Sequence, residues 1–299
     1  MISHIKHYAL TSYYFVKRLT TRLTEDRISL VSAGVAFYIF LSIFPALASV
    51  ISLYGLLTDP LDIQKHLEYF SDAIPTEAFG LLEDQIIRFT ESEQKKLGGG
   101  LIVGLAISMW SANKAMKAVA QSLNIAFNFK EDRSFLKVNL ITLGLTFISS
   151  IAFTFTLAIL IVIPVIVSSI LTEAIVEGFV VLVSWLMLIS AIFAVFTMLY
   201  RKAPAMHNRI NTKSLIPGSL SATILLLFGS VSFSLYVANF GSYDAQYGTL
   251  ASVVVTMLWL YIGAFIFLTG AEINAIILNK HGDLDSAKKR VSATDAGSA

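Results

Sequence analysis

Charged side chains lie within or directly beside the apolar stretches of this chain at two places, and the side chains at both places are candidates for binding or proton transfer. Glu272 is the only acidic residue inside any of the six long apolar stretches. Lys114 and Lys117 directly follow the shortest stretch. A carboxylate at membrane depth is costly and therefore marks a candidate functional site that needs a partner. We expect Glu272 to pair with Lys114, with Arg201 as the competing partner.

Helical spacing extends this polar region along one face. Trp110, Asn113, Lys114, Lys117, Gln121 and Asn124 fall on one broad face of a helix. Such a face cannot lie against lipid, so we expect it to face the bundle interior or water. Two readings stay open. In one, the charges only lock helices together, or Glu272 is an ordinary interface residue. In the other, Glu272, Lys114, Lys117, Asn113 and Asn274 line a cytoplasm-facing vestibule for an anionic headgroup or a proton.

Other site chemistries find little support in the residues. The five histidines, His4, His7, His66, His207 and His281, are scattered over different segments without an acidic cluster beside them. The chain has no cysteine, and its Gly98–Gly100 run opens an apolar helix instead of cradling a phosphate. The sequence also lacks the basic residues interleaved with aromatic residues that nucleic-acid binding would need. We therefore expect no catalytic residues, no metal, no cofactor and no nucleic-acid partner.

The elements that position these residues are predicted from hydropathy. Of the 299 residues, 56% are hydrophobic and only 14% are charged, and the mean hydropathy is +0.72. Long apolar runs of this kind indicate membrane-spanning helices. We predict an all-α bundle of six transmembrane helices at about 28–57, 98–113, 138–171, 179–200, 215–238 and 249–279.

Basic residues predict the orientation of these helices. The six predicted helices leave seven segments before, between and after them. Only four of the 22 Lys and Arg residues lie in the second, fourth and sixth of these segments, and all four are in the segment 58–97. Because basic loops stay in the cytoplasm, both termini are predicted to be cytoplasmic, in a multi-pass protein of a bacterial inner membrane.

Three segments lie outside the predicted spans. Residues 1–27 form an amphipathic cytoplasmic helix, which lies either on the anionic leaflet or on the cytoplasmic end of the bundle. The external segment 58–97 is predicted to be a small helical cap, and 280–299 a disordered cytoplasmic tail. Pro45 and Pro164 are expected to kink their helices.

The predicted outer loop 239–248 contains turn formers and aromatic residues but no basic residue. It is either an outer turn with interface-anchoring tyrosines or a loop that dips back to line a cavity mouth. With this loop, the candidate substrate path comprises Trp110, Asn113, Lys114, Lys117, Asn124, Arg201, Ser242, Tyr243, Asp244, Tyr247, Glu272 and Asn274.

Short motifs lie in order over about residues 27 to 280: Ala33–Tyr38, Ser42–Pro45, Trp110–Ala115, Tyr200–Arg201, Pro217–Gly218, Phe240–Leu250 and Gly270–Ala275. Together they are similar to the signature motifs of the YihY/BrkB family of bacterial inner-membrane proteins. Asp244 stands where the family more often has Asn.

The resemblance implies a six-helix inner-membrane fold and a link to virulence, serum resistance and export of lipid or lipopolysaccharide precursors. Members have carried the name ribonuclease BN, which the missing metal ligands contradict. Two functions are therefore expected: movement of an amphipathic anionic substrate, or a non-transporting envelope scaffold or assembly factor. The partners would be membrane lipids and an anionic lipid or glycolipid, with a second copy or an envelope protein as a further partner. The substrate, the energy source and the oligomeric state do not follow from the sequence.

Overall fold

The computed structural model describes residues 2–57, 97–170, 174–205, 211–238 and 249–280. Within these ranges it describes no side chains for 2–12, 44–57, 97–106, 108–109, 153–170, 174–181, 249–252 and 280. The predicted external cap 58–97, the outer loop 239–248 and the tail 280–299 lie essentially outside the described residues. The secondary structure of the described part is helical, with no strand among the described residues.

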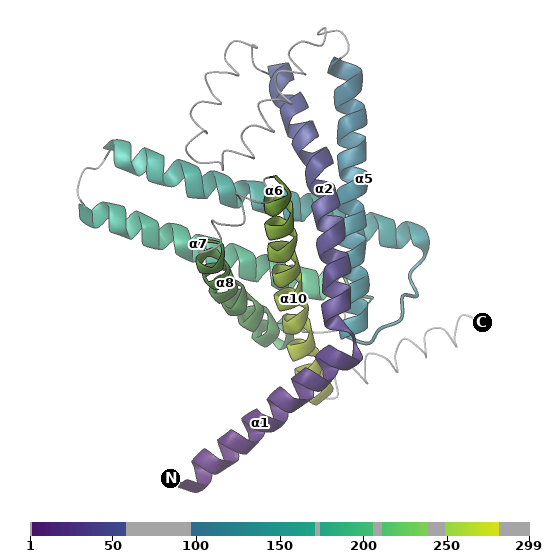
Figure 1. The fold of residues 1–299 in the computed structure, drawn as a ribbon, viewed down its shortest axis with the longest axis vertical. Coiled ribbons are helices and arrows are strands. Elements are labelled where there is room, and N and C mark those ends of the chain that lie inside the picture. Colours follow the sequence, from purple (N-terminus) through teal and green to yellow (C-terminus); the bar gives the residue numbers. More distant parts are fainter. Residues whose placement is uncertain (1, 58–96, 171–173, 206–210, 239–248, 281–299) are drawn as a thin grey trace. The chain divides into compact units, whose positions relative to one another are not determined.

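The helices follow one another along the chain in the order drawn in Figure 1. Their bounds are α1 Ile2–Glu25, α2 Ile28–Leu57, α5 Leu97–Ala126, α6 Phe135–Ile170, α7 Ala174–Lys202, the 3₁₀ turn η2 Thr212–Leu215, α8 Ile216–Ala238 and α10 Thr249–Lys280.

All six predicted apolar stretches are helices, because uninterrupted apolar runs hydrogen-bond their backbone internally. Helix α5 continues to Ala126, well past its apolar part, as its short apolar run required. Helix α6 continues to Ile170 past Pro164, and α2 runs through Pro45 to Leu57. Both prolines lie where side chains are not described, so the predicted kinks stay predictions.

Four described helical segments are long and apolar enough to cross a membrane: Phe135–Ala152, Leu182–Lys202, Thr212–Ala238 and Val253–Asn279. A fifth is added if Tyr13–Glu25 and Ile28–Ile43, which meet at an angle of 59°, are counted as one broken span. The finding supports a multi-span membrane protein. The number six and the cytoplasmic placement of both termini stay predictions.

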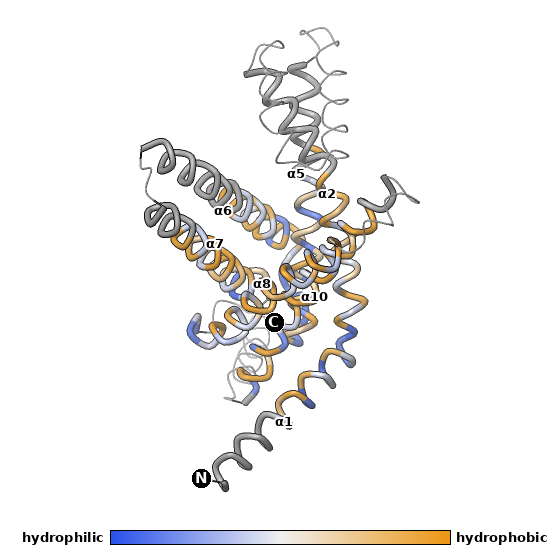
Figure 2. The backbone as a smooth tube through the Cα atoms, turned by 60° about the vertical axis from the view of Figure 1, so that its left-hand side comes forward, coloured by the Kyte–Doolittle hydropathy of each residue, from blue (hydrophilic) through white to orange (hydrophobic). Residues whose placement is uncertain are grey.

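The chain divides into two compact units. The first comprises Met1–Gly34, Met116–Val231 and Ile262–Ala299, and the second comprises Val35–Ala115 and Ser232–Tyr261. In the first unit, α6 and α7 lie side by side (Figures 1 and 2). Large buried residues of this unit include Ile28, Leu123, Phe127, Tyr200 and Leu268.

The outer surfaces of the spans in the first unit are apolar, which is the reverse of a soluble protein. Leu136 and Leu140 on α6, Leu186 on α7 and Phe228 on α8 are largely exposed. Figure 2 shows hydrophobic residues along most of the described length of α7 and α8. Apolar side chains exposed in this way need lipid around them, so the helices fold as membrane elements.

Helix α1 ends at a sharp bend. Arg27 has a φ of 50°, and its N–H donates to the Thr24 carbonyl at 3.1 Å. Left-handed residues at this position close a helix C-terminus. The Arg27 carbonyl then accepts from Val31 in the first turn of α2. The predicted amphipathic segment is therefore a helix joined to α2 by a tight two-residue connection.

Candidate functional site: two arginine clusters

Glu272 is the most deeply buried charged side chain in the described part of the chain. It lies on α10 and is 0% exposed. Arg22 of α1, whose side chain is 17% exposed, donates from Nε to Glu272 Oε2 at 2.6 Å. The sequence suggested Lys114, or Arg201, as the partner of Glu272; the structure shows Arg22 as a partner that the sequence did not suggest.

The Arg22 guanidinium holds more than one element. Its Nη2 donates to the backbone oxygen of Ala126 at 2.8 Å and approaches Asp26 Oδ2 at 3.4 Å. Ala126 is the last residue of α5, where helix carbonyls lack partners and carry partial negative charge. One cation thus joins α1, α5 and α10. We call Arg22, Asp26, Ala126 and Glu272 the Arg22 cluster.

The Arg22 cluster is incompletely paired. It contains two carboxyl groups but only one guanidinium. Glu272 Oε1 is buried and has no hydrogen-bond partner among the described residues. A buried acceptor without a partner costs free energy. This oxygen could therefore receive a proton or a hydrogen bond from a ligand.

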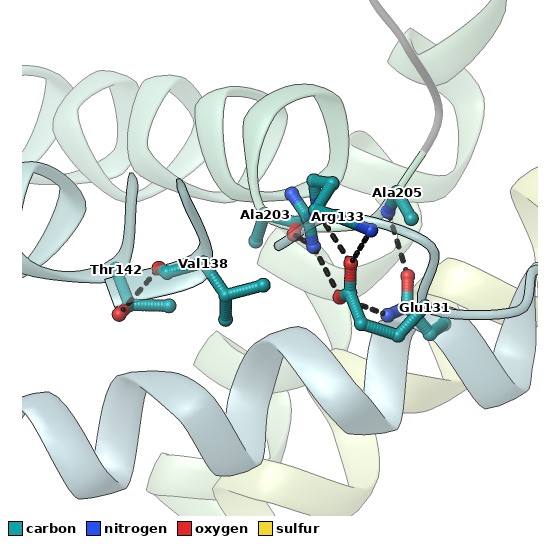
Figure 3. Close-up of polar contacts among 7 residues, drawn as sticks. Glu131, Arg133, Val138, Thr142, Ala203 and Ala205 are labelled. Atoms are coloured by element: carbon teal, nitrogen blue, oxygen red, sulfur yellow. Dashed lines mark hydrogen bonds and ion pairs between the residues drawn. The ribbon is translucent and has the colours of Figure 1, made fainter. Parts of the chain in front are cut away.

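A second cluster lies between α5 and the end of α7 in the same unit (Figure 3). Arg133 donates from Nε to Glu131 Oε1 at 2.7 Å and from Nη2 to Glu131 Oε2 at 2.6 Å. Nη2 also donates to the Ala203 carbonyl at 3.1 Å. Asn124 donates to Glu131 Oε2 at 3.0 Å and accepts from the Ala205 N–H at 2.7 Å. These five residues form the Arg133 cluster.

Every carboxylate oxygen of the Arg133 cluster has a donor. Burial raises the pKa of the Glu131 carboxyl, but the hydrogen bonds and charge of Arg133, helped by Asn124, outweigh burial and hold the pKa below its usual 4.5. Glu131 therefore stays ionised, and the bidentate arginine fixes its geometry.

Asn274, the other predicted residue on α10, fastens helices without charge. Its Oδ1 accepts from the Gly218 N–H at 2.8 Å, a first-turn donor of α8 that lacks a partner within its helix. A Cβ on Gly218 would lie 2.2 Å from the Gly270 carbonyl oxygen. Glycine is therefore required for this close approach of α8 and α10.

The predicted basic residues of α5 lie near aromatic rings. In the second unit, Lys114 Nζ lies 3.6 Å from the centre of the Trp110 ring, which is 60% exposed. In the first unit, Lys117 Nζ lies 5.5 Å from the Phe135 ring. Both distances fall within the range of cation–π contacts.

The other members of the predicted path differ in position. Asn113 is buried, and its Oδ1 has no partner in the described part of the chain. Arg201 is exposed at the end of α7. Ser242, Tyr243, Asp244 and Tyr247 lie outside the described residues. In the first unit, the structure gathers Glu272 with Arg22 and Asn124 with Arg133, and among the described residues it finds no group of His, Asp and Glu suited to a metal.

Four charged residues of the clusters were missed by the sequence analysis: Arg22, Asp26, Glu131 and Arg133. Arg22 and Asp26 are spaced i, i+4, and Glu131 and Arg133 are separated by one residue. On a helix, opposite charges spaced i, i+4 signal a local ion pair, whereas a spacing of two residues does not. Neither spacing signals the distant partners Glu272 and Ala203.

Comparison with known proteins identifies the family to which the chain is similar. The family model described as "Virulence factor BrkB" matches residues 19–294. A "Putative ribonuclease-like protein YfkH" of Bacillus subtilis is 30% identical over 88% of this chain and 94% of its own. A "UPF0761 membrane protein" of Aliivibrio fischeri is 29% identical over 92% of this chain and 86% of its own. No solved structure matches the chain.

Proposed function

The chain belongs to the family of the virulence factor BrkB, a membrane-protein family, and from this premise we propose that it moves an amphipathic anionic substrate across the bacterial inner membrane. A lipid or lipopolysaccharide precursor has this chemistry. The proposal includes six spans with both termini in the cytoplasm, and it rests on charge placement in the sequence and on the Arg22 cluster in the structure.

The observation that carries the proposal is Glu272. Burying a carboxylate in an apolar helix costs free energy. If the only role of Glu272 were to hold helices together, an apolar side chain would do so at a lower cost in free energy. Here one carboxylate oxygen is left without a partner in the described part of the protein, and a second carboxylate, Asp26, faces the same guanidinium. Ionisable groups of this kind inside spans mark substrate or proton paths.

Cations paired with exposed aromatic rings supply the second support. The Lys114 ammonium over Trp110 presents a positive charge and an indole on the helix surface. Lys117 beside Phe135 repeats this pairing. Aromatic and basic side chains together suit the headgroup region of a bilayer, where an anionic headgroup meets apolar chains.

A non-transporting envelope scaffold or assembly factor is the second candidate. The Arg133 cluster and the Asn274–Gly218 bond favour it, because their charged and polar groups hold helices together. Ribonuclease activity, which the name of the Bacillus relative suggests, is not part of either proposal. The scattered histidines give no constellation for phosphodiester chemistry.

Lipid analysis after depletion tests the proposal. The lipid and lipopolysaccharide contents of the inner and outer membranes are compared in depleted cells that carry the wild type, Glu272→Gln or Lys114→Gln. Asp132→Asn is the matched control, because Asp132 is an exposed acid outside both clusters. We expect precursor to accumulate in the inner membrane on depletion and with Glu272→Gln, and a normal distribution with Asp132→Asn.

Two outcomes count against transport. An unchanged lipid distribution on depletion would overturn it. Full rescue by Glu272→Gln, with amounts of folded protein equal to the wild type, would remove the observation on which it rests and favour the scaffold.

A further inference from the structure

We propose that α1 is a lipid-binding arm, which binds the anionic surface of the bilayer leaflet at the end of the bundle where Arg22 fastens it. The proposal goes beyond transport and does not depend on it. The sequence left open whether this helix lies on the leaflet or on the bundle; the geometry points to a division of α1 between the two.

Arg22 sets the depth of the arm. It binds Glu272, which lies seven residues before the end of the candidate span Val253–Asn279. At 1.5 Å per residue, Glu272 is about 10 Å along the axis from that end. Arg22 also binds the final carbonyl of α5. The C-terminal turn of α1 is therefore held close to the ends of two helices of the first unit.

One face of α1 provides this attachment. Phe15, Leu19, Arg22 and Leu23 are the partly buried residues of its described portion, and Asp26, just beyond its end, is partly buried too. They recur every three or four residues and so share a side of the helix. The attachment to the bundle thus uses only this side.

The rest of α1 carries apolar and basic side chains that the bundle does not cover. Tyr13, Tyr14 and Val16 are 62%, 64% and 56% exposed. Lys17 and Arg18 are exposed, and among the described residues neither has an ion pair. Figure 2 shows hydrophilic and hydrophobic residues interspersed along the described part of α1.

Charge complementarity selects the occupant of this surface. An anionic leaflet attracts unpaired Lys and Arg side chains, and Tyr13 and Val16, three residues apart on one side of the helix, can enter its interfacial layer. The 59° bend at Arg27 turns α1 out of the line of α2. A helix turned in this way at the end of a span can lie along the bilayer surface instead of continuing across it.

Site-directed spin labelling tests the arm in the full chain. The sequence contains no cysteine, so single substitutions label one site each. Val16→Cys and Thr21→Cys are five residues apart, about 140° around the helix. The accessibility of each label to oxygen and to a water-soluble nickel complex is measured in nanodiscs that contain phosphatidylglycerol, and in nanodiscs of phosphatidylcholine alone.

In phosphatidylglycerol, we expect the label at Val16 to favour oxygen and the label at Thr21 to favour the nickel complex. This contrast should shrink in phosphatidylcholine, at high salt and in a Lys17→Gln/Arg18→Gln background, because each weakens the attraction to the leaflet. The matched control is Lys130→Gln/Lys213→Gln, which removes two exposed charges outside α1 and should keep the contrast.

Three outcomes would overturn the proposal. Two water-exposed labels in every lipid would show a free helix, and two oxygen-favouring labels would show one broken span. Spin–spin broadening that is independent of lipid charge would show that a second copy of the chain covers the arm.

Discussion

The two arginine clusters of the first unit are built from the same kinds of group, but they differ in how completely the glutamate is hydrogen-bonded. In each, an arginine binds a glutamate carboxylate and the backbone carbonyl at the end of a helix. In the Arg133 cluster both oxygens of Glu131 accept hydrogen bonds, whereas in the Arg22 cluster Glu272 Oε1 accepts none from the described residues. The Arg133 cluster is therefore complete as a fastening, while the Arg22 cluster keeps a binding capacity that fastening does not use.

Removing one arginine at a time should separate the clusters most strongly. Arg22→Leu leaves the buried Glu272 carboxylate uncompensated, and such a loss costs about 3–5 kcal/mol. Arg133→Leu should cost about 1–2 kcal/mol, because water can reach Glu131. Thermal and denaturant unfolding in the same detergent micelles measures both. Equal losses would show that the clusters do not differ in burial.

Gly218→Ala measures how much the close, uncharged contact between α8 and α10 contributes to the free energy of unfolding. The added Cβ would meet the Gly270 carbonyl and the Asn274 side chain. Such overpacking costs about 1–3 kcal/mol. Gly144→Ala on α6 is the matched control, because nothing lies within 4 Å of its Cβ position. The control should be neutral or slightly stabilising; equal destabilisation by both variants would exclude the close contact as the cause.

Tyr200→Phe gives the scale for one buried hydrogen bond. The Tyr200 hydroxyl donates to the Phe267 carbonyl at 2.5 Å, and the two rings stack at 4.8 Å. Because phenylalanine keeps the stacking, the loss should be about 0.5–1.5 kcal/mol by unfolding. Tyr13→Phe at an exposed site should change nothing. A loss as large as that of Arg22→Leu would mean that charge does not distinguish the Arg22 cluster.

The smallest expected effect is the pH dependence of the Arg133 cluster. The folded pKa of Glu131 lies below its usual 4.5. Its stabilisation is therefore fully present above that pH and is lost as the pH falls through the folded pKa. The difference in unfolding free energy between wild type and Glu131→Gln should be constant near neutral pH and narrow below about pH 4.5. For a partly exposed pair it should stay below about 1 kcal/mol. A difference that widens in acid would contradict the lowered pKa.

The helices of this protein follow directly from its sequence, whereas the clusters do not. Apolar runs must satisfy their backbone internally, so each of the six stretches became a helix. Helical spacing placed Asn124 on a polar face, and the structure gives it two hydrogen-bond partners, Glu131 and the Ala205 N–H. Spacing can indicate the face, but not what the face meets.

Arg22 shows why partners were missed. It lies 250 residues from Glu272 in the chain and belongs to a helix that hydropathy separates from the spans. Two features bring it there: the left-handed Arg27 that ends α1, and the carbonyl of Ala126 that ends α5. Neither is visible in residue types alone, because a positive φ at arginine is rare. The outer-loop residues Ser242 to Tyr247 and the kinks at Pro45 and Pro164 stay predictions.

The double variant Arg22→Leu/Glu272→Leu tests most directly whether the Arg22 cluster does more than hold helices together. Replacing both charges with apolar groups removes the uncompensated carboxylate, so unfolding should be within about 1 kcal/mol of the wild type or more stable. In depleted cells, this folded protein should fail to restore the distribution of lipid precursors between the two membranes. A double variant that is equally stable and restores the wild-type distribution would contradict the account, because the buried pair would then be a fastening alone.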